Sequence, residues 1–184
     1  MRPGSVDRWP FSFLDTIRYG DLDANRHLNN VVYLQFFEDA RIAYVASLVP
    51  GRDVAESDGF GVIFAEAHIN YRAPAFYEET IRTWIRPFAL RRSSFRMAFR
   101  MVAEGDGRLL AEGWGALVGY DYAAGRAAPL ADELVAALRR AGAADSEIDA
   151  LSDLHEHPSQ PAPPAPPTPT PPPAPRDPLP NLEA

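Results

Sequence analysis

Ten consecutive residues near the start of this sequence carry the side chains best suited to catalysis. A carboxylate can act as a nucleophile or as a base toward water, and amide and imidazole groups can orient water or a carbonyl. Almost wholly apolar sequence follows at once, which is unusual for a surface loop, so we interpret the cluster as a candidate site. Its members are Asp21, Asp23, Asn25, His27, Asn29 and Asn30.

The segment from Leu28 to Leu48 is expected to form the helix that this cluster opens onto. Apolar residues occur on every side of it, a pattern typical of a buried helix. Charged residues in its middle, Glu38, Asp39 and Arg41, argue against a membrane span. The N-terminus of such a helix presents free N–H groups and a partial positive charge, which suits a developing oxyanion. Four side chains could cap it: Asp23, Asn25, Asn29 or Asn30.

Composition limits the remaining possibilities. With 184 residues and 46% apolar content, the chain can form one domain with a core. It has no cysteine, and His155 and His157 lack further ligands nearby, so we expect no metal site. The net charge of −7 disfavours nucleic-acid binding. No apolar run suits a signal peptide or a membrane span, and we expect a cytoplasmic protein.

Three regions follow one another along the chain. Residues 9–140 are expected to fold as one domain, and residues 141–157 read as an acidic connector. Residues 158–184 form a proline-rich tail that we expect to be disordered, with thirteen prolines between Pro158 and Pro180. Proline removes backbone donors, so this tail should be an extended polyproline segment that either docks a proline-reading domain or acts as a spacer.

The folded region is predicted to be α+β. Short turns separate most of the expected strands, which favours antiparallel neighbours, and the sheet would wrap around the long helix. A short amphipathic helix is expected at Ala131–Arg140. Because open sheet edges favour pairing between copies, we expect a homodimer. The expected strands are Phe11–Arg18, Val62–Tyr71, Thr80–Phe88, Ser93–Ala103 and Leu109–Tyr122.

The first motif resembles that of a known family. The run DLDANRHLNNVVYLQFFEDAR is similar to the D-x-D-x-x-x-H-x-N-N-x-x-Y-x-x-x-x-E-x-A-R signature of hotdog-fold thioesterases of the 4-hydroxybenzoyl-CoA thioesterase type. INYRAPAFYEE and GYDYAAGRAAPL give weaker support, and the resemblance covers about residues 11–140. It implies a hotdog fold of about five strands around one helix, and hydrolysis of a fatty or aromatic acyl-CoA to free acid and CoA. It also implies no cofactor besides the CoA of the substrate, and a homodimer or tetramer.

The resemblance also assigns roles to single residues. Asp23 matches the family's catalytic carboxylate, acting as nucleophile or general base. Asn25 and His27 match a D-x-N-x-H set of related plant acyl-carrier-protein thioesterases, which also use a downstream glutamate, and Glu66 is a candidate for it. Tyr19 matches an aromatic lining position of some bacterial relatives. Some relatives carry histidine at the position of Asn30, so this chain departs from them there.

Further substrate contacts are expected from the residues themselves, each with a structural alternative. Asn29 and Asn30 could orient the substrate or simply cap the helix, just as Asp23 could be a cap and His27 a structural histidine. Tyr33 could line an acyl slot or be plain core. Two adjacent arginines could grip the CoA phosphates, or be ordinary turn charges: Arg91 and Arg92.

Two other functions remain open from the sequence. Hotdog hydratases and dehydratases use a similar set of groups, with D-x-N-x-x-H spacing, whereas the spacing here is one residue shorter. A non-catalytic acyl-binding scaffold that presents its proline tail to a partner is the other alternative. Retention of Asp23 argues for the hydrolase.

Overall fold

A computed structural model describes residues 9–51 and 61–143 of the chain. The expected tail and most of the acidic connector lie outside the described residues. The elements, in chain order, are β1 (Phe11–Thr16), the 3-10 turn η2 (Tyr19–Asp21), α1 (Asn30–Leu48), β2 (Val62–Tyr71), β3 (Thr80–Phe88), β4 (Ser94–Ala103), β5 (Leu109–Asp121), β6 (Arg126–Ala127) and α2 (Asp132–Arg140).

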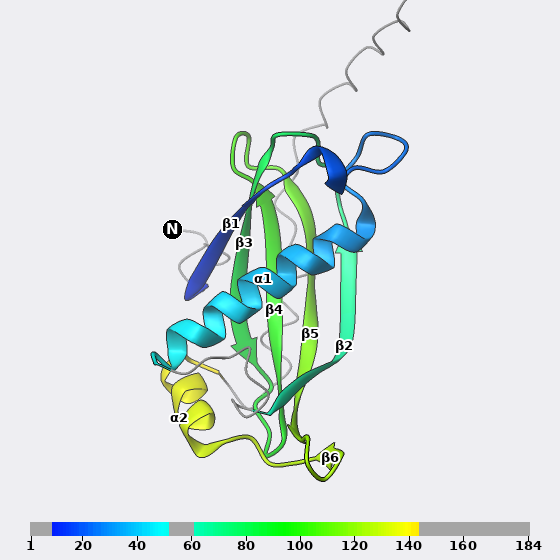
Figure 1. Cartoon of the computed structure of the whole chain (residues 1–184). Helices are drawn as coiled ribbons and strands as arrows, with labels where there is room; N and C mark the ends of the chain where they lie inside the picture. The colour runs from blue at the N-terminus through cyan, green and yellow to red at the C-terminus, as the bar shows by residue number, and fades with distance from the viewer. Residues whose placement is uncertain (1–8, 52–60, 144–184) are drawn as a thin grey trace, which may run out of the picture.

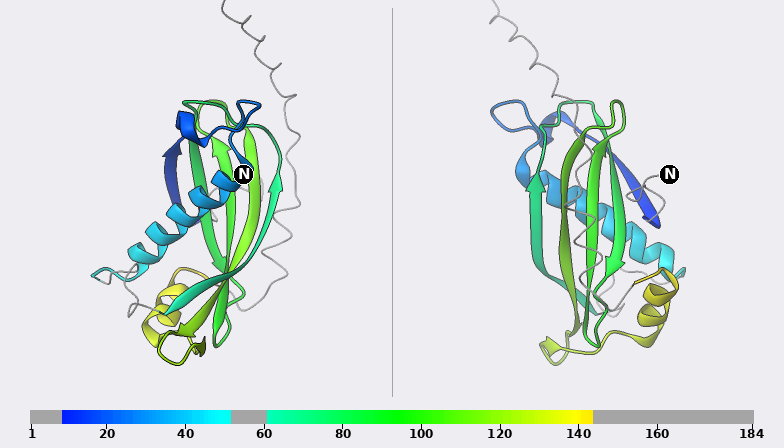
Figure 2. Two further views of the ribbon diagram at one scale, coloured as in Figure 1. Left: turned by 45° about the vertical axis from the view of Figure 1, so that its right-hand side comes forward. Right: turned by 180° about the vertical axis from the view of Figure 1, so that it is seen from behind.

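The strands form one antiparallel sheet with the order β1-β3-β4-β5-β2, and the two-residue β6 pairs with the end of β5. Helix α1 runs diagonally across one face of this sheet, from the end of β2 toward the start of β1 (Figure 1). Two further views show the same two layers, with α2 beyond the C-terminal end of α1 (Figure 2). The start of α1 and the edge strand β2 therefore lie on the same side of the molecule.

The core lies between α1 and the sheet face beneath it. Alternate residues of β3 and β4 point into it, which is the period-two pattern of strands, and Phe37 of α1 lies 4.4 Å from Phe99 of β4 between ring centroids. Burying one such side chain contributes roughly 1.5–3 kcal/mol. The pattern fixes α1 in place and thereby fixes where its N-terminus points.

Glycine is required where β5 passes closest to its neighbours. A Cβ at Gly113 would overlap the backbone carbonyl of His68 on β2. A Cβ at Gly115 would overlap the ring of Phe64 and press on that of Phe37. The two glycines therefore allow β2 to pair with β5 and the aromatic rings to pack against the sheet.

The structure confirms the predicted fold class, and the five predicted strands end within two residues of the observed ones. It corrects one expectation, because α1 is not buried on all sides: Val31 is 58% exposed and Ile42 is 43% exposed. A sheet of five strands covers only one side of a helix. Sequence reasoning missed η2 and β6, which are too short to show a period. Within the described residues, no helix has the length and apolar character needed to cross a membrane.

Candidate active site

A small closed loop immediately before α1 holds the carboxylate that the sequence singles out. Leu22 and Leu28 form an isolated antiparallel bridge, and the N–H of Asp23 donates to the carbonyl of His27 at 2.8 Å. Arg26 turns the chain back with a φ of 64°, a left-handed conformation that is uncommon outside glycine. The loop therefore keeps Asp23 at its neck, next to the first turn of α1.

The side chain of Asp23 is fixed by the backbone of its own loop. Its Oδ1 accepts hydrogen bonds from the N–H of Asn25 at 2.8 Å and from the N–H of His27 at 3.0 Å. Oδ2 receives no hydrogen bond from the part of the chain that the structure describes. The carboxylate is half-buried. One oxygen is thus held in place while the other remains available to a water molecule or a substrate.

Asn29, among the four candidate caps, is the one that caps α1. Its Oδ1 accepts from the N–H of Val31 at 3.1 Å. The N–H of Leu28 donates to Ala75, and that of Asn29 donates to the carbonyl of Asp21. Asn30, the first helical residue, has no carbonyl four residues back within the helix, and its N–H has no acceptor among the described residues. Of the donors expected between Leu28 and Asn30, only the last is open to an oxyanion.

The segment that follows β2 packs over this loop. The ring of Phe76 meets that of His27 edge-on, with centroids 5.4 Å apart. Tyr77 does the same with Tyr19 at 6.1 Å, and the hydroxyl of Tyr71 donates to the carbonyl of Asn30 at 2.9 Å. Sequence reasoning did not assign these three aromatic residues to the site, although the INYRAPAFYEE motif that contains them was noted.

The predicted residues that gather here have different environments. Asn25 is exposed on the loop, His27 is half-buried, and Tyr19 is 79% exposed. Tyr33 is buried, and its hydroxyl donates to the carbonyl of Ala73 at 3.5 Å. Burial raises the pKa of Tyr33 to about 12, so it stays a neutral donor near pH 7.

A cavity of about 180 Å³ opens beside this site, between α1 and β2. Arg41 is one of its lining residues: it is buried, donates to Glu38 at 2.8 Å and lies 4.3 Å from the ring centroid of Phe64. Burial lowers the pKa of Arg41. The volume is below the roughly 300–1,000 Å³ of typical ligand pockets. The lining residues are Val31, Leu34, Gln35, Phe37, Glu38, Arg41 and Phe64.

Three predicted residues are not brought to Asp23 within one chain. Glu66 is exposed on the sheet face opposite α1, where it lies 3.9 Å from Arg96. Arg91 and Arg92 are exposed in the turn after β3. Since β3 starts near the site and runs nine residues away from it, that turn lies about 30 Å away along the sheet.

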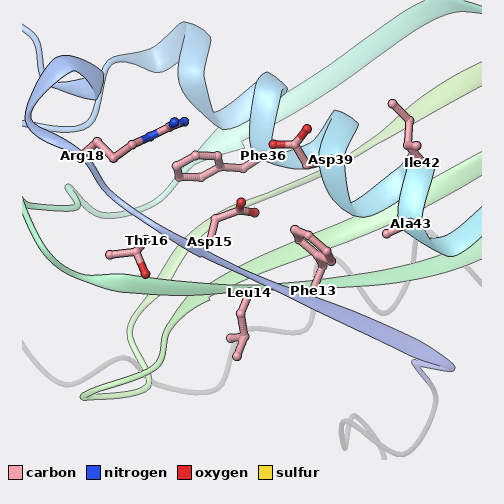
Figure 3. A pocket seen from close by; sticks show the side chains of 9 residues that line it. All are labelled: Phe13, Leu14, Asp15, Thr16, Arg18, Phe36, Asp39, Ile42 and Ala43. Atoms are coloured by element: carbon pink, nitrogen blue, oxygen red, sulfur yellow. The ribbon is translucent and has the colours of Figure 1, made fainter. Parts of the chain in front are cut away.

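A pair of carboxylates, Asp15 and Asp39, lies outside the site, in a groove of about 590 Å³ between β1 and α1. Asp15 of β1 points toward α1, on the side where Asp39 projects from the helix, and Arg18 lies at one end of the groove (Figure 3). Burial, and secondly the charge of Asp39, raise the pKa of Asp15 to about 6. Within the described residues, no three histidine, aspartate or glutamate side chains come together as metal ligands.

Comparisons with known proteins identify the family and the fold of this chain. The family model of the thioesterase-like superfamily matches residues 17–138. A thioesterase from Thermus thermophilus, solved with coenzyme A and zinc, is 30% identical, with a TM-score of 0.65 over 73% of this chain and 96% of that one. A putative thioesterase from Pseudomonas aeruginosa is 27% identical, with a TM-score of 0.64 over 71% and 98%.

A more distant structure shares the fold. It is a 1,4-dihydroxy-2-naphthoyl-CoA thioesterase from Synechocystis, 17% identical, with a TM-score of 0.64 over 70% of this chain and 95% of that one. No curated protein matches the sequence.

Proposed function

The chain belongs to the thioesterase-like superfamily, and we propose that it hydrolyses an acyl-CoA thioester to the free acid and CoA. The observation that carries this proposal is the position and the hydrogen bonding of the Asp23 carboxylate. Its carboxylate is held by two backbone amides just ahead of a helix whose first N–H is open. The Thermus thermophilus relative, solved with coenzyme A, supports the substrate class.

The chemistry needs an attacking oxygen and a stabilised oxyanion. In the proposed reaction the open oxygen of Asp23 either removes a proton from water or attacks the thioester carbonyl directly. The N–H of Asn30 then donates to the oxyanion, a contribution on the order of 3–4 kcal/mol per donor in other enzymes. The thiolate of CoA leaves, and in the nucleophilic route water hydrolyses the resulting anhydride.

A second copy of the chain is proposed to complete the site. β2 is an edge strand in the described sheet, and its Phe64, which lines the cavity beside α1, is 41% exposed. Antiparallel pairing of β2 with the β2 of a partner would extend the sheet and cover the cavity beside α1. Such antiparallel pairing also places the turn after β3 of the partner beside this chain's Asp23. Arg91 and Arg92 of the partner subunit are then the candidates for binding the CoA phosphates.

The experiment is thiol release from a panel of acyl-CoAs of increasing chain length, with aromatic acyl-CoAs and an enoyl-CoA included. Release of CoA by the wild-type chain supports the proposal, and the preferred acyl group defines the substrate. Hydration of the enoyl-CoA without thiol release would instead indicate a hydratase. Binding of acyl-CoA, measured by calorimetry, with neither reaction would indicate a scaffold. Either of these outcomes would overturn the proposal that the chain is a hydrolase.

A further inference from the structure

The sheet face that points away from α1, here called the outer face, gathers all three tryptophans of the chain. Trp84 and Trp114 occupy outward positions of β3 and β5, alternating with residues that face the core. Trp9, just before β1, packs with Trp114 on the buried pair Phe88 and Ala98 of the same face. An outer face of this kind is unusual for an exposed sheet surface, which is normally polar.

Each indole ring has an arginine over it. The guanidinium carbon of Arg96 lies 4.2 Å from the ring centroid of Trp114. Arg86 lies 5.3 Å from the ring centroid of Trp9, and Arg82 lies 5.6 Å from that of Trp84. Three arginines of this face also form ion pairs: Arg82 with Glu104 at 2.7 Å, Arg96 with Glu66 at 3.9 Å and Arg100 with Glu112 at 3.1 Å. The outer face therefore alternates aromatic rings with arginines that have carboxylate partners.

A groove of about 350 Å³ runs along this face, large enough for a ligand or a peptide segment. Trp9 and Trp84 provide its aromatic surface, Arg82 and Arg100 provide positive charge, and Glu104, the partner of Arg82, lines it as well. Grooves lined by aromatic rings are the sites that polyproline segments bind, because their preformed helix loses little entropy on docking.

The chain contains a segment of matching chemistry. Residues 144–184 hold seven of the 25 acidic residues and one of the 18 arginines, so they carry −6 of the formal charge of −7. The same residues hold thirteen of the 19 prolines. Five of the acidic residues precede the prolines closely: Asp145, Glu147, Asp149, Asp153 and Glu156. Acidic residues and prolines are thus both concentrated in residues 144–184.

Residues 144–184 are long enough to reach the outer face from the end of α2. It begins after Ala143, at the end of α2, and the fourteen residues before Pro158 span about 20 Å as a flexible coil. A helix with its side chains is about 10–12 Å across, so this reach is enough to pass from the helical layer to the outer face. The 23 residues from Pro158 to Pro180 span about 70 Å as polyproline, longer than any strand of the sheet.

We propose that the C-terminal segment, residues 144–184, docks on the outer face of its own domain. Its prolines occupy the groove of Trp9 and Trp84, and its carboxylates join Glu104 and Glu66 as additional partners of Arg82 and Arg96. The docked segment covers a face that would otherwise be open to sheet-to-sheet contact with a second copy. This role concerns the outer face alone and does not depend on the proposed thioesterase reaction.

The absence of cysteine and the three tryptophans allow a direct test on the full chain. A nitroxide spin label is attached to Ser159→Cys, and the three indole N–H signals are followed in an ¹⁵N spectrum before and after reduction of the label. Single Trp→Phe variants assign the signals. The matched control carries the same label and five additional changes that neutralise the acidic residues: Asp145→Asn, Glu147→Gln, Asp149→Asn, Asp153→Asn and Glu156→Gln.

The proposal predicts that the label removes most of the intensity of the Trp9 and Trp84 signals, and that neutralisation or high salt restores it. Chains that carry both the label and ¹⁵N should show this weakening of the Trp9 and Trp84 signals. A mixed sample combines ¹⁵N-enriched chains that have no label with labelled chains that have no ¹⁵N enrichment, and in it the two signals should keep their intensity. Weakening of the same signals in the mixed sample would show docking on another copy and overturn the proposal. Unchanged indole intensities in every sample would overturn it as well.

Discussion

Replacing Asp15 by asparagine should stabilise the protein near neutral pH. Asp15 lies between β1 and α1, its Oδ2 is buried without a hydrogen bond, and it faces Asp39 across the groove. Burial is the main cause that raises the pKa of Asp15 from 3.8 to about 6, followed by the charge of Asp39 and, least, that of Asp21. The positive charge of Arg18 lowers this pKa and opposes them. Ionisation of this side chain therefore works against folding, and the variant removes that ionisation.

The size of the effect follows from the pKa. Raising the pKa of Asp15 from 3.8 to about 6 corresponds to about 3 kcal/mol, and because the groove is open to water we expect about half of this, about 1.5 kcal/mol. The folded-state pKa is raised, so the stability contribution of protonated Asp15 is complete below pH 4 and is lost as the pH rises through 6. The advantage of Asp15→Asn is thus absent at low pH and complete above about pH 7.

The assay is urea unfolding of the wild-type chain and Asp15→Asn at intervals from pH 4 to pH 8. The difference between their free energies of unfolding should rise along a curve centred between 3.8 and about 6. Asp39→Asn is the matched control, because it keeps Asp15 and lowers its pKa, so it should stabilise less. A difference that is the same at every pH would refute the reasoning, since ionisation would then not be its cause.

Substitutions at three further residues test the packing and the capping. Glu112→Gln removes a buried negative charge that pairs with Arg72 at 3.0 Å and with Arg100 at 3.1 Å. The free energy of urea unfolding should fall by about 3–5 kcal/mol, and an unchanged unfolding midpoint would contradict the pairing. Asn29→Ala removes the cap of α1 and should cost about 1 kcal/mol, whereas Asn29→Asp should cost less; equal losses would argue against capping. Phe99→Ala should cost about 3–5 kcal/mol in thermal unfolding, and a loss below 1 kcal/mol would contradict its place in the core.

The strands and helices could be predicted because they depend on local periodicity. Residues 81, 83 and 85 of β3 alternate with polar or large outward residues, and the prediction Thr80–Phe88 coincides with the observed strand. Capping was harder to predict. Asp23, Asn25, Asn29 and Asn30 offer the same kind of acceptor, and only the closed loop before α1 decides that Asn29 reaches the helix while Asp23 binds its own loop.

The position of Glu66 shows why part of the candidate site could not be predicted. The pairing of β2 with β5 shifts register between Phe64 and Glu66. A one-residue shift moves every later side chain to the other face of the sheet, and periodicity alone does not indicate where a bulge falls. The same holds for Tyr71, Phe76 and Tyr77, whose positions over the loop depend on the end of β2 rather than on local sequence.

The turnover of Asp23→Asn tests the central proposal most directly. Asparagine keeps an Oδ1 that can accept from the amides of Asn25 and His27, so the loop should hold while the charge is lost. With the best acyl-CoA of the panel, kcat should fall about 10²–10⁴-fold with unchanged thermal stability, while Asp39→Asn keeps the wild-type kcat. An Asp23→Asn variant that hydrolyses the substrate at the wild-type rate would contradict the proposal.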